Sequence, residues 1–382
     1  MRFTKTITPV AVALGTLFSV IPFSASADVV VKVGFAAPLT GPNANYGKDL
    51  QYGVQMALDD AMAQGIKING QPAKLQLVAE DDQADPKTGS AVAQKLVDEG
   101  VNVIVGHFNS GTTIPASEIY QRAGIPDIDP AATNPKITGR GYENIFMVIS
   151  SDAQNAGTAG TYAVKTTKAK RIAIIDDRTA FGQGEADEFE KAVKAAGGNI
   201  IGREYTTNQA TDFKTQLTKL KGLNPDLIFV AALNPQAAGI MKQMRQLGIN
   251  AQFVGGGGVM DAEFVKLAGD AADGAMAWEY GRPLDSTPVG KGFAEKFKKK
   301  FNADAASYAP FGYDAAWTAI KAMQAANSTK PADYRPKLKT IAFDGITGHI
   351  AFNPDGSLKE GSSTVYQVKG GKWTAVNTMK GL

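Results

Sequence analysis

Residues 106–117, GHFNSGTTIPAS, decide the fold of this chain. They end the apolar run VNVIVG at 101–106 and lead into IPASEIYQRAG at 114–124, whose apolar spacing predicts a helix. A buried strand that gives way to a helix is the repeating unit of a parallel sheet covered by helices. Because ligands of such sheets bind beyond the carboxyl ends of the strands, this stretch also predicts where a site lies.

The same alternation of strand and helix extends through most of the chain. Before residue 150, predicted strands lie at 29–35, 74–82, 101–106 and 124–129, and predicted helices lie at 46–65, 85–100 and 114–124. The alternation restarts at AKRIAIIDD, residues 169–177, and continues to GGGG at 255–258. The chain therefore predicts an α/β protein with two doubly wound, parallel-sheet halves.

The first 27 residues have the layout of a cleaved secretory signal. Arg2 and Lys5 precede an apolar stretch, and Ala25-x-Ala27 precedes Asp28. An uncleaved membrane anchor is the alternative, but the apolar core is short for a span and two prolines interrupt it. We expect cleavage after Ala27 and a mature chain of 355 of the 382 residues in the periplasm.

The composition narrows the class of function. The chain has no cysteine, which excludes a disulfide framework and the lipid-bearing cysteine of a lipoprotein. Without the signal, 38 of the 40 basic residues remain against 37 acidic ones, so no electrostatic feature predicts a nucleic acid or a membrane surface as partner. Metal-ligand spacing is absent from the sequence, and we expect neither a metal nor a cofactor.

Small polar residues follow two consecutive predicted strands. Ser110 and Thr112 offer hydroxyl groups, and Gly111 lets a ligand approach the backbone closely. A helix that begins there presents unpaired N–H groups, which suit a carboxylate or phosphate. DPAATNP, residues 129–135, repeats the arrangement with Thr133. A plain helix cap is the alternative for each loop alone, but the pair predicts an anion pocket.

Several segments together resemble a known family. They are VKVGFAAPLTGPNANYG, EDDQADPKTG, GHFNSGTTIPAS, DPAATNPKITGRGYENIF, RIAIIDDRTAFGQG, FVGGGGV and GHIAFNPDGSLK. The chain is similar over essentially its whole mature length to the periplasmic binding proteins of branched-chain amino acid ABC importers, the Leu/Ile/Val type. Any one of these segments alone would be a weak signal.

The resemblance implies a type I periplasmic binding protein fold. In that fold two lobes are joined by a three-strand hinge, and the ligand lies in the cleft between them. The expected N-terminal lobe comprises residues 28–150 and 281–350, and the expected C-terminal lobe comprises residues 151–280 and 351–382.

The resemblance also implies a set of ligand-binding residues. The first lobe would hold a ligand carboxylate through Ser110 and Thr133 and through backbone groups near Asn109 and Ala131. The remaining expected contacts form the walls of the cleft: Tyr46, Phe108 and Tyr308 from the first lobe, and Phe181 closing over the ligand from the second. Ordinary packing is the alternative for each of these residues.

Two positions depart from the family pattern. Gly257 stands where the family has an acid that pairs with the ligand's α-ammonium, and Leu233 stands where an aromatic hydroxyl is usual. Because an unpaired buried ammonium costs several kcal/mol, another acid must substitute or the ligand lacks the group. Glu279 and Asp176 are candidate substitutes. An aromatic acid, a keto acid or another small carboxylate therefore stays open beside a branched-chain amino acid.

The predicted function is that of a monomeric solute-binding protein, which closes on a small carboxylate and delivers it to an inner-membrane ABC permease. A ligand sensor for a signalling receptor is the first alternative, and no sequence feature excludes it. An enzyme is the second, and we expect the protein not to be one. The chain has neither a G-x-S-x-G elbow nor a cysteine, and His107 and His349 lie far apart in sequence. The three acids at 80–82 and the two at 176–177 could form an acid pair or a Mg²⁺ site, but we interpret them as ordinary loop acids.

Overall fold

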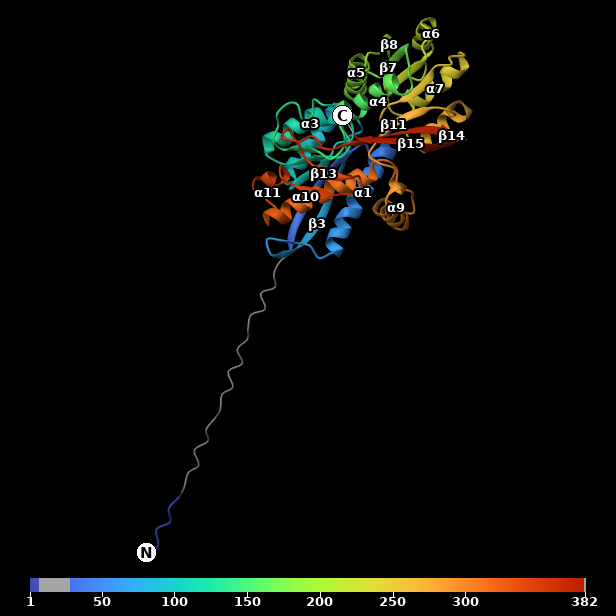
Figure 1. The fold of residues 1–382 in the computed structure, drawn as a ribbon. Coiled ribbons are helices and arrows are strands. Elements are labelled where there is room, and N and C mark those ends of the chain that lie inside the picture. The colour runs from blue at the N-terminus through green and yellow to red at the C-terminus, as the bar shows by residue number, and fades with distance from the viewer. Residues whose placement is uncertain (7–27, 381–382) are drawn as a thin grey trace.

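The computed structural model describes residues 1–6 and 28–380, so most of the predicted signal at 1–27 lies outside the described residues. Within them, two large sheets form two lobes (Figure 1). The first sheet has the order β2-β3-β1-β4-β5-β6 and the second has the order β15-β14-β11-β10-β9-β7-β8.

The strands of the first sheet are β1 (Val29–Ala37), β2 (Lys67–Ile68), β3 (Gln71–Asp81), β4 (Val103–Gly106), β5 (Asp127–Asp129) and β6 (Ile145–Met147). Those of the second are β7 (Ile172–Asp176), β8 (Ile200–Tyr205), β9 (Leu227–Ala231), β10 (Gln252–Gly255), β11 (Met276–Tyr280), β14 (Ser362–Lys369) and β15 (Lys372–Lys380).

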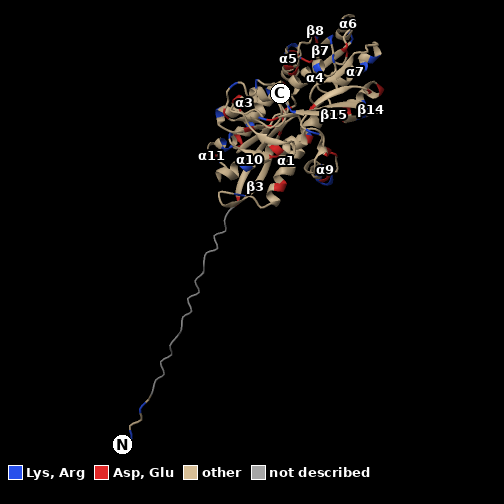
Figure 2. Ribbon diagram, in the orientation of Figure 1, with Lys and Arg blue, Asp and Glu red and all other residues tan. Residues whose placement is uncertain are grey.

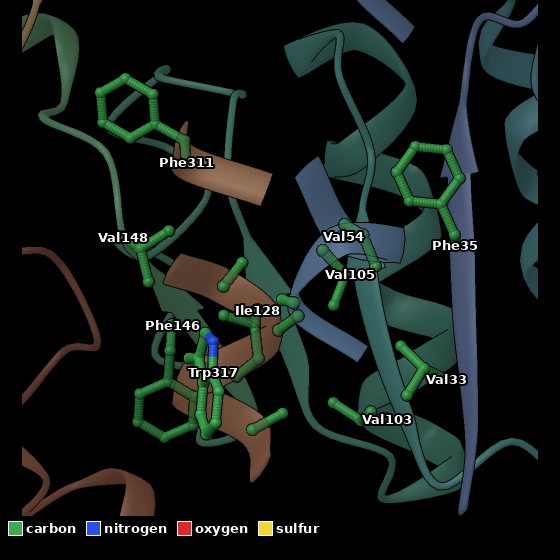
Figure 3. Packing of buried hydrophobic residues seen from close by; sticks show 14 of the residues in the cluster. Val33, Phe35, Val54, Val103, Val105, Ile128, Phe146, Val148, Phe311 and Trp317 are labelled. Atoms are coloured by element: carbon green, nitrogen blue, oxygen red, sulfur yellow. The ribbon is translucent and has the colours of Figure 1, made fainter. Parts of the chain in front are cut away.

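Helices cover both faces of the first sheet. Val103 and Val105 of β4 pack with α1 (Ala44–Ala63) and α10 (Ala309–Ala326), whereas Ile104 packs with α2 (Pro86–Asp98) and α3 (Ser110–Ala123). Successive side chains of a strand point to opposite faces, so an unbroken apolar run is what such a sheet requires. Figure 3 shows the layer on the first of these faces.

Two glycines bring α1 and α10 into close contact. A Cβ at Gly53 would collide with the carbonyl of Ala309, and a Cβ at Gly312 would collide with the carbonyl of Leu50. Asp49 fixes the same junction, because its carboxylate accepts the amides of residues 306, 308 and 309 at 2.7–2.9 Å. The start of α10, and with it residue 308, is therefore held rigidly against the first lobe.

The second lobe repeats this layering. The helices α4 (Asp152–Lys165) and α5 (Ala180–Ala195) cover one face, and α6 (Lys214–Gly222), α7 (Gln236–Gln246) and α8 (Ala262–Ala268) cover the other. Phe189 of α5 stacks on Phe229 of β9 with 3.9 Å between the ring centroids. This packing fixes the buried face of α5 against the sheet.

The chain passes between the two sheets three times, after β6, after β11 and before β14. The crossings are bonded to one another: the carbonyl of Ser362 accepts the amide of Gly281 at 2.8 Å and the hydroxyl of Ser150 at 3.3 Å. Thr364 donates its hydroxyl to the carbonyl of Gly281 at 2.8 Å. The predicted two-lobed fold with a three-strand hinge is confirmed.

The remaining described elements lie just before β11 or after it. They are two short 3-10 turns, Gly269–Ala272 and Leu284–Ser286, and α9 (Pro288–Phe301), α11 (Pro331–Leu338), β12 (Ala342–Asp344) and β13 (His349–Ala351). Basic and acidic residues are interspersed over both lobes (Figure 2). Among the described helices, none combines the length and the apolar character that a membrane span needs.

The predicted elements differ from the observed ones at identifiable points. The edge strand β2 runs antiparallel to β3 after a turn at Asn69 and Gly70, whose positive φ angles of 54° and 71° suit a tight hairpin. The strands β14 and β15 are also antiparallel to their neighbours. Helix α3 begins at Ser110, four residues before the predicted start. The residue boundaries of the two lobes stay a prediction, and residues 350, 352 and 358 pack with the core of the first sheet.

Candidate functional site: the cleft between the lobes

The ends of β4 and β5 in the first lobe lie buried beneath the second lobe. Asn109 precedes α3, and its carbonyl accepts the amides of Thr112 and Thr113 at 3.0 and 2.9 Å. Ser110 is completely buried, and Thr133 is 1% exposed. The side-chain amide of residue 134 donates to the carbonyl of residue 180 in the second lobe at 2.6 Å. These strand ends therefore face the second lobe, as the predicted anion pocket requires.

Part of the predicted pocket is already hydrogen-bonded within the protein. The hydroxyl oxygen of Ser110 accepts the amides of Thr133 and Asn134, each at 3.3 Å. The amide of Ala131 donates to the carboxylate of Asp129 at 3.0 Å. The hydroxyl of Thr133, by contrast, lies among buried groups without a hydrogen-bond partner. The Ser110 hydroxyl donates no hydrogen bond among the described residues, so the hydroxyl hydrogens of Ser110 and Thr133 are both available to a ligand.

His107 has a structural position behind this pocket. Its ring contacts the Asp82 carboxylate at 2.7 Å through Nδ1 and the Tyr120 hydroxyl at 2.9 Å through Nε2, and all three residues are buried. Both ring nitrogens are occupied, so the residue anchors the end of β4 to the neighbouring elements.

Three aromatic residues of the first lobe form one wall. Tyr46 stacks on Phe108 with 5.0 Å between ring centroids, and Tyr308 meets both rings edge-on at 5.8 and 4.9 Å. The Tyr46 hydroxyl donates to the carbonyl of Gly258 in the second lobe at 2.9 Å. The three aromatic residues predicted for the first lobe are thus brought together, and one of them bonds directly across the cleft.

The glycine segment after β10 is surrounded by side chains. A Cβ at Gly256 would collide with the Glu185 carboxylate, and a Cβ at Gly257 would collide with the Tyr280 hydroxyl. The amide of Gly257 donates to Glu185 Oε1 at 2.6 Å, and the amide of Gly258 donates to Glu279 Oε2 at 3.2 Å. The segment lacks side chains because acids and a tyrosine from neighbouring elements occupy that space.

Three buried carboxyl groups lie near the glycine segment: Asp152 from α4, Glu185 from α5 and Glu279 from β11. Asp152 and Glu185 are completely buried, and Glu279 is 2% exposed. Burial raises the pKa of Glu279 to about 8 and that of Asp152 to about 7, and it raises the pKa of Glu185 well above its ordinary value. Among the described residues, none of the three forms an ion pair with a basic side chain. A buried carboxylate without a cation is unstable, so the site favours a positively charged partner or a bound proton.

Two cavities lie where residues of both lobes meet. One has a volume of about 590 Å³ and lies between the lobes, where it is lined by Asn109, Phe181 and Leu233. The other has a volume of about 520 Å³ and is lined by Tyr46, Tyr308, Gly258 and residues 260–263. The second cavity therefore lies at the contact between residues 46 and 258, and the first lies beside the start of α3, but Ser110 and Thr133 line neither of them.

Asp176 and Glu279, the two candidate substitutes for the acid that pairs with the ligand's α-ammonium in the family, have different surroundings in the structure. The Asp176 carboxylate forms an ion pair with Arg203 at 2.8 Å and accepts the amide of Arg178 at 3.0 Å. Its negative charge is therefore already neutralised within the protein. Glu279 lies at the glycine segment. Glu185 was missed, although its signal is in the sequence: it lies on the buried stripe of α5 with Phe189.

Two lobes that enclose a buried cleft define a ligand-binding protein. A family model described as periplasmic binding protein matches residues 30–372. A Leu/Ile/Val-binding protein homolog 1 from Brucella suis is 35% identical over 353 residues, which cover 92% of this chain and 94% of that protein. The Leu/Ile/Val-binding protein of Escherichia coli K12 is 32% identical over 86% of this chain and 88% of its own.

Solved structures show the same fold. LivJ of Streptococcus pneumoniae, described as a branched-chain amino acid transporter substrate-binding protein in complex with isoleucine, has a TM-score of 0.83 at 27% identity, with 92% of this chain and 99% of that chain covered. This chain therefore belongs to the periplasmic binding protein family, whose members bind solutes and are not enzymes.

Proposed function

We propose that this protein captures a small carboxylate, with a branched-chain amino acid favoured, and delivers it to the permease of an ABC importer. One observation carries the proposal: the hydroxyl-bearing ends of β4 and β5 are buried against the second lobe beside an aromatic wall. The Thr133 hydroxyl has unused hydrogen-bonding capacity there. A ligand carboxylate would accept that bond and the hydrogen of Ser110, and the helix α3 begins at the same point.

The walls of the cleft suit an aliphatic side chain. Phe108, Tyr46 and Leu233 are buried and apolar on their facing surfaces. Burying one aliphatic side chain contributes about 1.5–3 kcal/mol, and each charge-assisted hydrogen bond contributes about 1.5–3 kcal/mol. After the costs of association and closure, a Kd of about 1 μM follows. The relatives named for leucine, isoleucine and valine support this ligand class.

The three bonded crossings support a mechanism of closure. Ligand binding draws the lobes together about the hinge at Ser150, Gly281 and Ser362 and presents a joint surface to a membrane partner. A periplasmic location after cleavage at Ala27, and action as a monomer, complete the proposal. A sensor that feeds a signalling receptor would use the same closure and stays the alternative.

A thermal-unfolding screen tests the proposal. Leucine, isoleucine, valine, their keto acids and benzoate are added separately to the mature protein. A ligand at 100 times its Kd stabilises the folded state by about 2.7 kcal/mol, so a true ligand raises the Tm visibly. We expect a rise with at least one branched-chain amino acid. If none of these carboxylates raises the Tm or gives heat in calorimetry, the proposed ligand class is wrong.

A further inference from the structure

The acid nearest the glycine segment comes from a helix of the second lobe. Glu185 lies on α5 in the same buried stripe as Gly182, Ala186 and Phe189. Its Oε1 accepts the amide of Gly257 at 2.6 Å. Its carboxylate lies where a side chain of Gly256 would otherwise stand. Helix α5 therefore supplies a carboxylate to a place that a residue of the loop would normally fill.

Acceptor atoms around Glu185 lack partners. Glu185 Oε2, both carboxylate oxygens of Asp152 and the hydroxyl of Tyr280 are buried and have no hydrogen bond. The Thr133 hydroxyl of the first lobe lies next to Asp152 and Tyr280, so the donor assigned to the ligand carboxylate is adjacent to these acceptors. An unsatisfied buried polar group destabilises the folded protein. A group with several N–H donors would satisfy them together.

Glu279 differs from Glu185 in this respect. Its Oε2 accepts the amide of Gly258 and its Oε1 accepts the amide of Tyr280, each at 3.2 Å. Both oxygens of Glu279 are thus engaged in holding the backbone. Among these three acids, free acceptor capacity therefore remains on Glu185 and Asp152.

We propose that Glu185, assisted by Asp152, binds a primary ammonium group of the ligand and so makes this protein selective for amino acids over the corresponding keto acids. The inference rests on the proposed function, because it assigns one end of the ligand held by Thr133. A primary ammonium carries three N–H donors and one positive charge. It would satisfy Glu185 Oε2 and a carboxylate oxygen of Asp152 and offset their negative charge.

The glycine segment is explained by the same assignment. An acid on the loop at residue 257 would meet Tyr280, and any side chain at residue 256 would meet Glu185. A side chain at residue 256 and the Glu185 carboxylate therefore compete for one region of space, and Tyr280 fills the space next to residue 257. In this chain the acid beside the loop comes from α5.

Calorimetry with leucine and its keto acid, 4-methyl-2-oxopentanoate, tests the assignment in the wild type and in Glu185→Gln. The wild type should bind leucine at least 100-fold more tightly than the keto acid. Glu185→Gln should weaken leucine binding at least 30-fold and leave keto acid binding within threefold. Asp152→Asn should weaken leucine binding in the same direction, by a smaller factor. Glu295→Gln makes the same chemical change on exposed helix α9 and should alter neither affinity.

The outcomes separate this inference from the proposed function. If Glu185→Gln is folded by circular dichroism and binds leucine within threefold of wild type, the assignment to Glu185 is overturned. If the wild type binds the keto acid as tightly as leucine, ammonium selectivity is overturned, while capture of a carboxylate stands. If the wild type binds neither compound nor any other carboxylate of the screen, both proposals fall.

Discussion

The Tyr46 hydroxyl donates to the carbonyl of Gly258 across the cleft at 2.9 Å, and this bond joins the two lobes at the edge of the site. Tyr46 is 3% exposed and stacks on Phe108, so its ring is positioned by the first lobe. Gly258 has a φ of +79°, which turns the loop and is strained for other residues. The closed arrangement therefore depends on a first-lobe donor and a second-lobe carbonyl that meet only when the lobes do.

Removing this bond should disfavour closure. We expect Tyr46→Phe to keep the stacking with Phe108 and to weaken ligand binding about 3- to 10-fold, since one interlobe hydrogen bond contributes about 0.5–1.5 kcal/mol. Calorimetry gives the affinity, and small-angle X-ray scattering with and without ligand gives the degree of closure. Tyr52→Phe, at a half-exposed position of the same helix, is the matched control. Equal affinity in Tyr46→Phe and wild type would show that the bond plays no part in closure.

The hydroxyl groups of the first lobe should matter for the carboxylate end of the ligand. We expect Ser110→Ala and Thr133→Ala each to weaken binding by tenfold or more, because each removes a donor to a buried charge. Thr133→Ala should destabilise the unliganded protein only slightly, because its hydroxyl lies beside Asp152 and Tyr280 without a well-formed hydrogen bond. Ser110→Ala should lower the Tm slightly, because two amides lose their acceptor. Calorimetry measures the ligand affinity, and thermal unfolding measures the Tm. If neither variant differs from the wild type in affinity, this carboxylate site is contradicted.

Much of the fold followed from the sequence because burial on both faces forces unbroken apolar runs. The strand at 101–106 and the strand at 169–177 could be located in this way, and helices between them followed from their spacing. The antiparallel edge strands were not predicted, although Asn69 and Gly70 form a recognisable hairpin signal. Pairing at sheet edges depends on long-range contacts that a local pattern does not carry.

The candidate site was predictable only in part. Residues at strand ends, such as Ser110 and Thr133, follow from the rule that parallel strands expose their carboxyl ends at one edge. Glu185 and Asp152 lie inside or at the start of helices, and only the packing of α5 against the sheet brings Glu185 beneath the glycine segment. An acid on a buried helix stripe is the signal that was present in the sequence.

Gly256 and Glu185 should be energetically coupled. We expect Gly256→Ala to destabilise the protein by about 1–3 kcal/mol, because the new Cβ collides with the Glu185 carboxylate. In a Glu185→Ala background the same change should cost much less. Urea denaturation of the four proteins of this cycle measures the coupling. The control Gly292→Ala, on α9 where no atom lies within 4 Å of the new Cβ, should be neutral or stabilising. Additive effects of the 256 and 185 changes would contradict the packing described above.

The stability of the unliganded protein should fall as the pH rises from 6 to 8. Burial raises the pKa of Asp152 to about 7 and that of Glu279 to about 8, and the groups that face them, Glu185, Glu188 and Asp261, are also acidic. A carboxyl whose pKa is higher in the folded state holds its proton there after the unfolded chain has released it. Its stabilising contribution is therefore complete at low pH and is lost as the pH rises through the folded-state pKa.

We expect the Tm of the ligand-free protein to drop by about 2–6 °C between pH 6 and pH 8. Glu279→Gln should reduce this drop, because a neutral amide has no proton to lose, although it keeps only one of the two backbone acceptors and should lower the Tm at every pH. A bound amino acid should reduce it further, since its ammonium offsets the charge that appears on Glu185 and Asp152. Differential scanning calorimetry at several pH values, with and without leucine, gives all three results. A Tm that rises with pH over this range in the ligand-free wild type would mean that the cluster is ionised in the folded protein without a cation.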